Sequence, residues 1–168
     1  MRRLGKWVLL TMIAAGCQKN EAVSEFTGNQ ATYSLQQGSV YSVSGTVVFR
    51  ERKDGQVSAI IQLVGTEGDI KHPVHLHLGD ISKPDADVAL LLNPVVGSTG
   101  KSETVFGALA DESPIDYNRL TKLQACVKIH LGETGAARDI ILVGGNIGSS
   151  FVDAPSSGRL GMSVCKSE

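Results

Sequence analysis

Short apolar runs separated by turn signals are the feature that most constrains the fold of this chain. Val57, Ala59, Ile61 and Leu63 recur at intervals of two, the period of a β-strand whose side chains alternate between faces. The Asp54-Gly55 dipeptide before them is typical of a tight hairpin turn. Similar runs predict strands at 31–35, 40–50, 71–78, 104–109, 123–131, 139–143 and 160–165. We therefore predict an all-β sandwich or barrel.

Other segments interrupt this pattern. Asn93-Pro94, residues 97–100 and the glycine- and serine-rich stretch 144–158 predict loops. Residues 114–123 have the spacing of a single helical turn.

Length and charge limit the class of protein. The 168 residues predict one domain, which we place at 39–168 after a polar tether with a first short strand at 18–38. The formal net charge of -1 argues against a nucleic-acid partner, because such a partner requires a basic face.

The first 17 residues have the composition of an export signal. Basic residues precede an apolar stretch at 7–15, and three small residues stand directly before Cys17. This segment resembles a bacterial lipoprotein signal, which implies lipid attachment at Cys17 and a place in the cell envelope, on the periplasmic or outer-membrane face. An ordinary secretory signal with a chance cysteine is the alternative. A membrane-spanning helix is disfavoured, because the apolar run is shorter than about 20 residues.

The two remaining cysteines, Cys126 and Cys165, form an even pair in a compartment that favours oxidation. We predict a disulfide bond between them, which would join the strand of His130 to the C-terminal segment. The alternatives are two buried thiols or a thiolate metal site.

Three of the four histidines, His72, His75 and His77, lie in one predicted strand. His75 and His77 point to the same face of this strand, and the apolar residues beside them point to the other. If the strand at 123–131 brings His130 to that face, three imidazoles meet around one point, which suits copper or zinc. The alternative is a pair of solvent-facing histidines.

Two residues close to this motif, His72 and Asp80, are not expected to be principal metal ligands. We expect His72, which precedes Pro73, to lie at the surface, with an accessory ligand as the alternative. We expect Asp80 to be a turn residue that could also orient an imidazole.

The first half of the chain resembles copper/zinc superoxide dismutases. The resemblance rests on residues 43–49, the hairpin, residues 57–63, Glu67-Gly68 and the His75-Leu76-His77 strand, and it extends loosely to residue 165. It implies a Greek-key antiparallel β-sandwich or barrel that holds copper through His75, His77 and a later His130. Arg159 resembles the active-site arginine of that family, although its spacing to Cys165 is wider than usual. The alternative is that Arg159 is a plain surface charge.

The zinc half of that family's site is replaced in this chain. Leu91 stands where the family has the histidine that bridges copper and zinc. Val105 and Ala108 stand where a histidine and an aspartate would bind zinc. The resemblance therefore implies a copper site without a zinc site beside it.

The chain also resembles CHRD domains, found in chordin and in bacterial secreted proteins. This resemblance rests on His75-Leu76-His77, on residues 127–130, and on the glycine turn and strand that follow. It implies a similar β-sandwich acting as an adhesion or interaction module.

We therefore predict a lipid-anchored envelope protein that binds one copper ion through three histidines, with zinc as the other metal that suits the same ligands. The enzyme alternative is a copper-only superoxide dismutase that also uses Arg159. The non-metal alternative is a CHRD-type module with incidental histidines. The sequence identifies no protein partner.

Overall fold

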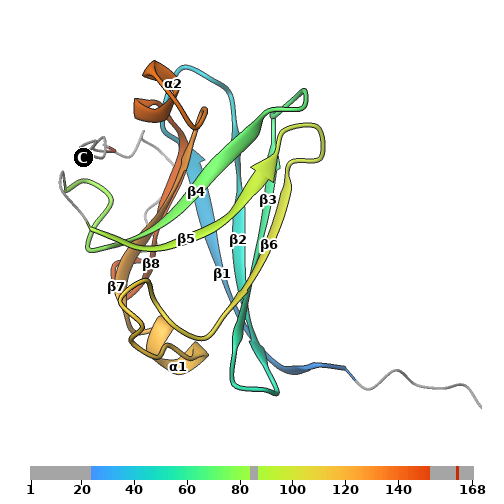
Figure 1. The fold of residues 1–168 in the computed structure, drawn as a ribbon, viewed down its shortest axis with the longest axis vertical. Helices are drawn as coiled ribbons and strands as arrows, with labels where there is room; N and C mark the ends of the chain where they lie inside the picture. The colour runs from blue at the N-terminus through green and yellow to red at the C-terminus, as the bar shows by residue number, and fades with distance from the viewer. Residues whose placement is uncertain (1–23, 84–86, 152–161, 163–168) are drawn as a thin grey trace, which may run out of the picture.

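The computed structural model describes residues 24–83, 87–151 and 162. These residues form eight strands that close into an antiparallel barrel, with two short helices at its opposite ends (Figure 1). The strands are β1 (Phe26–Gln37), β2 (Ser44–Arg52), β3 (Val57–Val64), β4 (Lys71–Leu78), β5 (Val88–Val96), β6 (Lys101–Phe106), β7 (Gln124–His130) and β8 (Ile141–Gly148), and the helices are α1 (Tyr117–Leu120) and α2 (Ala136–Asp139). The all-β prediction is confirmed.

The order of strands around the barrel is β1-β2-β3-β6-β5-β4-β7-β8, and β8 pairs with β1 to close it. The order β7-β4-β5-β6 is a Greek key, in which a later strand returns beside the first of three consecutive ones. Consequently β3 pairs with β6, and β4 lies between β5 and β7. The strand that carries three histidines thus lies next to the strand that carries the fourth.

Apolar side chains from every strand fill the barrel interior. Because side chains alternate along a strand, β4 contributes Val74 and Leu76 to this core, and β7 contributes Val127 and Ile129. All four are at most 1% exposed. The residues between them therefore lie on the outer face of the barrel.

β5 carries two irregularities that β4 does not share. Its register with β4 shifts between His72 and Val74 and again between Leu76 and His77, and at each shift β5 has one residue more than β4. Pro94 lies at the first shift, where a strand tolerates a residue without an N–H group. The predicted break at Asn93-Pro94 is therefore wrong, and β5 continues to Val96.

The loop predicted from residue 144 is also wrong at its start, since β8 runs to Gly148. A Cβ atom on Gly145 would collide with the carbonyl oxygen of Ser34, and one on Gly144 would lie 2.6 Å from Cδ1 of Ile81. These glycines allow close approach of neighbouring segments inside a strand rather than forming a turn.

The ends of other elements differ from the prediction. β1 has 12 residues where the sequence predicted a strand at 31–35, so the barrel already begins within the expected tether. Asp139, expected at the start of a strand, ends α2. The predicted helical turn is α1, capped by Asp116, whose side chain accepts a hydrogen bond from the Arg119 N–H group. The export segment and, except for Met162, the predicted strand at 160–165 lie outside the described residues.

Candidate metal centre

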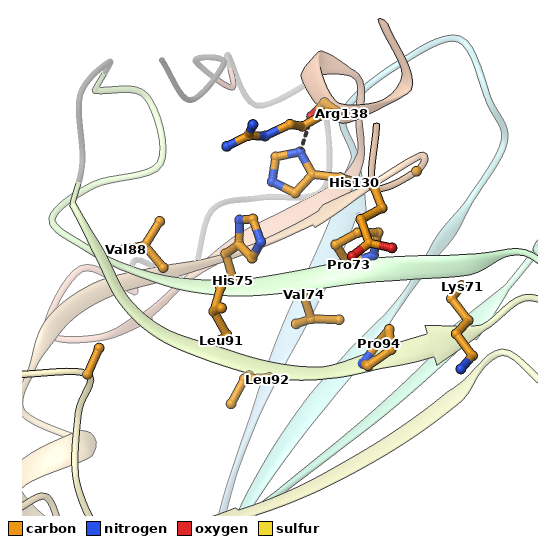
Figure 2. A pocket seen from close by; sticks show the side chains of 13 residues that line it. Lys71, Pro73, Val74, His75, Val88, Leu91, Leu92, Pro94, His130 and Arg138 are labelled. Atoms are coloured by element: carbon orange, nitrogen blue, oxygen red, sulfur yellow. Dashed lines mark hydrogen bonds between the residues drawn. The ribbon is translucent and has the colours of Figure 1, made fainter. Parts of the chain in front are cut away.

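Three histidines meet on the outer face of β4 and β7. The rings of His75 and His77, two residues apart on β4, have centroids 5.8 Å apart. The β4–β7 register pairs His75 with Lys128, so His130 lies diagonally across from His75 on the same face, with ring centroids 4.7 Å apart. Figure 2 shows the His75 and His130 rings turned toward one another. One ring nitrogen from each histidine lies within 4.8 Å of the others.

Two of these imidazoles have a buried nitrogen with no hydrogen-bond partner among the described residues. His130 Nδ1 lies 2.6 Å from the carbonyl oxygen of Arg138 and donates to it, which leaves a lone pair on Nε2. Within the described residues, His130 Nε2 and His75 Nδ1 are buried and have no partner. Because buried polar atoms are nearly always hydrogen-bonded, these nitrogens call for a ligand that accepts their lone pairs.

The surroundings favour the neutral form of the His75 and His130 imidazoles. Burial, followed by His130, His77 and Arg138, lowers the pKa of His75 to about 4. Burial also lowers the pKa of His130, against the raising effect of its hydrogen bond to Arg138. Neutral imidazole is the form that binds a metal ion, so no proton has to leave these two rings at pH 7.

The cluster has the composition and size of a metal site. Ligand nitrogens at about 2.0–2.1 Å from a metal lie roughly 3.3–4.2 Å apart, so small ring rotations would close the 4.8 Å cluster around one ion. Three imidazoles suit copper or zinc. It is the one group of three or more histidine, cysteine or acidic side chains with this geometry in the described part of the chain.

A groove gives access to the cluster from one side. His77 and His130 are buried and His75 is half-buried, so the open side of the cluster lies at His75. The groove has a volume of about 750 Å³. Its lining residues come from β4, from β5, from the loop after β6, from the end of β7 and from the segment between β7 and β8: Lys71, Pro73, Val74, His75, Val88, Leu91, Leu92, Pro94, Ala110, His130, Gly132, Glu133 and Arg138.

The prediction that His72 lies at the surface is wrong. His72 is 3% exposed, and its Nδ1 lies 2.9 Å from the carbonyl oxygen of Leu131. It shares the parity of Val74, so it lies on the core face of β4, opposite to His75 and His77. Pro73 does favour an extended backbone at His72, but an extended residue can face either side of a strand.

Asp80 is a turn residue, as predicted, but its partners in the described residues are not imidazoles. Its carboxylate accepts hydrogen bonds from Ser82 and, at 2.6 Å, from the Asn146 side chain. The bonds to Ser82, more than the one to Asn146, lower the pKa of Asp80. These contacts fasten the turn after β4 to β8.

The remaining predicted site residues fall into two groups. Cys126 is buried on β7 opposite His77. Cys17, Arg159 and Cys165 lie outside the described residues, so the lipid anchor, the disulfide bond and the role of Arg159 stay predictions.

The three residues that the superoxide-dismutase resemblance would place at zinc positions have apolar side chains without a ligand atom. Leu91 pairs with His75 across β4 and β5 and is 66% exposed. Val105 is exposed on β6, and Ala108 forms a bridge to Pro114.

Two residues of this region were missed by the sequence analysis. Lys128 is fully buried on β7 and has the parity of His130, so strand alternation could have found it. Arg138 supplies its carbonyl oxygen to His130 from α2 and lines the groove. No sequence pattern marks that carbonyl, because every residue has one.

Comparison of the chain with protein-family models, with curated proteins and with solved structures finds no match. The described residues thus define an all-β barrel with a three-histidine cluster that could hold a metal ion. None of their helices is long and apolar enough to cross a membrane.

Proposed function

We propose that this protein binds one copper ion through His75, His77 and His130 and acts in copper binding or handling. The observation that carries the proposal is the approach of three ring nitrogens to within 4.8 Å of one another. The unpartnered His75 Nδ1 and His130 Nε2 support it. Copper is preferred to zinc because nitrogen ligands bind Cu²⁺ more tightly than Zn²⁺.

In this proposal, the protein is attached to the cell envelope by a lipid at Cys17. The support is the lipoprotein-like segment at 1–17, and β1 begins at Phe26. Nine residues span at most about 32 Å, so the anchor would keep the barrel close to the membrane. Cys17→Ser should move the protein from the membrane fraction to the soluble fraction. An unchanged distribution would contradict lipid anchoring.

Copper uptake tests the metal proposal. The purified protein should take up close to one equivalent of copper, measured by elemental analysis after desalting, and the His75→Ala/His77→Ala double variant should lose it. His72→Ala is the matched control, since it removes a buried histidine outside the cluster. Circular dichroism verifies that each variant is folded. Uptake unchanged in the double variant would contradict the proposal and favour the CHRD-type module.

A copper-only superoxide dismutase is the second candidate. The half-buried His75 faces a groove that is also lined by Arg138, so a small anion has a path to the cluster. Copper-loaded protein should then consume superoxide faster than the copper-treated double variant. Equal rates would rule out this candidate and leave copper binding untouched.

A further inference from the structure

The groove beside the histidine cluster has one apolar wall. β5 supplies Val88, Leu91 and Leu92 to it, and Pro73 and Pro94 add to this surface. Val88 is 42% exposed and Leu91 is 66% exposed, so the wall includes two large apolar side chains in contact with water. An exposed apolar surface inside a concavity is typical of a binding site.

The charges of the groove are unequal at its two ends. Arg138 lies at the histidine end, where its side chain extends over the His130 ring (Figure 2). Arg138 is also one of the groups that lower the pKa of His75. Lys71 lies four residues before His75 on β4, roughly 13 Å away. Glu133 is the one acidic lining residue, so the lining carries a net positive charge.

The size of the groove indicates a small molecule rather than a protein. Its volume of about 750 Å³ lies in the usual range of small-molecule sites, about 300–1,000 Å³. A stable protein interface covers about 800 Å² on each partner, which is far more than this lining offers.

We propose that the groove binds an apolar monocarboxylate, with the carboxylate at the Arg138 guanidinium and the hydrocarbon part against the exposed side chains of Val88 and Leu91. The guanidinium provides two parallel N–H donors that match a carboxylate. The apolar wall excludes water from the hydrocarbon part. The inference rests on the groove alone and holds for metal-free protein.

Calorimetric titration of metal-free protein with acetate, butyrate and hexanoate tests the proposal. Affinity should rise with each methylene, so that hexanoate binds at least about tenfold more tightly than acetate. Hexylamine, which has the same chain length and the opposite charge, should bind at least about tenfold more weakly than hexanoate. Affinity independent of chain length, or hexylamine as tight as hexanoate, would overturn the proposal.

Two variants and two matched controls locate the site. Arg138→Gln and Leu91→Asn should each weaken hexanoate binding about fivefold or more, and Arg138→Gln keeps the backbone carbonyl that holds His130. Arg119→Gln and Val105→Asn change an exposed cation and an exposed apolar residue that do not line the groove, and should leave the affinity unchanged. Equal effects in variants and controls would place binding elsewhere.

Copper uptake by the same preparations separates this inference from the proposed function. Hexanoate binding without copper uptake would remove the copper proposal and keep the carboxylate site. Copper uptake without hexanoate binding would remove the carboxylate site and keep the copper proposal.

Discussion

His72 and His130 make nearly the same contacts in two different regions of the barrel. Both are buried, with exposures of 3% and 1%, and each places Nδ1 against a backbone carbonyl oxygen, at 2.9 Å and 2.6 Å. Both have a buried Nε2 without a partner in the described residues. His130 shares its strand face with two imidazoles, and His72 lies on the core face. An unpartnered nitrogen is therefore insufficient for a metal site. The face of the strand on which a histidine lies determines whether it can join the other two imidazoles.

The two carbonyl oxygens also come from different kinds of segment. That of Leu131 directly follows β7, so the hydrogen bond of His72 fastens the start of β4 to the end of β7. That of Arg138 belongs to α2, so the ring of His130 depends on a short helical turn. We expect His72 to matter for stability and His130 for metal affinity.

The largest expected effect separates the two residues by copper affinity. His130→Ala removes a ligand and should lower the affinity by at least about 100-fold, since even the loss of an outer-shell partner costs 10–100-fold. His72→Ala should leave the affinity within a factor of about two. Competition with a chelator of known affinity measures both. Equal losses in the two variants would show that His72 takes part in the site.

The stability of the metal-free protein should show the opposite order. His72→Ala leaves the Leu131 carbonyl without its partner and opens a space in the interior, which should cost about 1–3 kcal/mol in free energy of unfolding. His75→Ala removes a half-buried ring with an unpartnered nitrogen and should cost less. Urea unfolding measures both values. A smaller loss for His72→Ala than for His75→Ala would contradict a structural role for His72.

Acid should release copper only at unusually low pH. Because the pKa of His75 is about 4, its proton competes with copper only near and below this pH. Through His75 alone, affinity should be steady from pH 7 to about pH 5 and should fall roughly tenfold one unit below the pKa of that residue. Release centred near pH 6.5, the ordinary value for histidine, would show that the cluster does not shield its ligands.

Metal-free protein offers a second readout of the same pKa shift. Between pH 6.5 and about 4 the unfolded chain protonates His75 and the folded chain does not. The free energy of unfolding should therefore decrease as the pH falls through this window and be fully restored above it. His75→Gln should make the decrease shallower, and an unchanged slope would assign it to other groups.

The smallest expected effect tests the helical turn that orients His130. Gly135, directly before α2, has φ 61° and ψ -152°, a conformation that other residues reach only with strain. Gly135→Ala should lower copper affinity about two- to tenfold through Arg138. Gly55→Ala, at a positive φ in the hairpin between β2 and β3, should cost similar stability and leave the affinity unchanged. Equal affinities in both variants would show that α2 does not set the orientation of His130.

Local sequence patterns predicted the features that depend on strand period. Alternation placed His75 and His77 on one face, and the short apolar runs predicted an all-β fold. His130 was assigned to the cluster from its similar strand and from the family resemblance, and the β4–β7 register does bring it to that face.

Long-range contacts explain what the sequence analysis missed. In the sequence, Gly144 and Gly145 resemble a turn. In the structure they lie within β8, where β1 and the turn after β4 pack against them. The burial of His72 depends on a carbonyl oxygen 59 residues away in the chain. The role of Arg138 depends on its backbone, which carries no sequence signature.

The extra residues of β5 have a consequence for insertions and deletions. β5 absorbs both register shifts, and the pairing of β4 with β7 runs without interruption from Val74 to Leu78. One more residue within 88–96 would enlarge an existing bulge and leave the histidines in place. One more residue within 73–75 would reverse the facing of part of β4, turning histidines toward the core or apolar residues toward water. Length variation in this barrel should therefore be tolerated on one side of β4 and excluded from β4 itself.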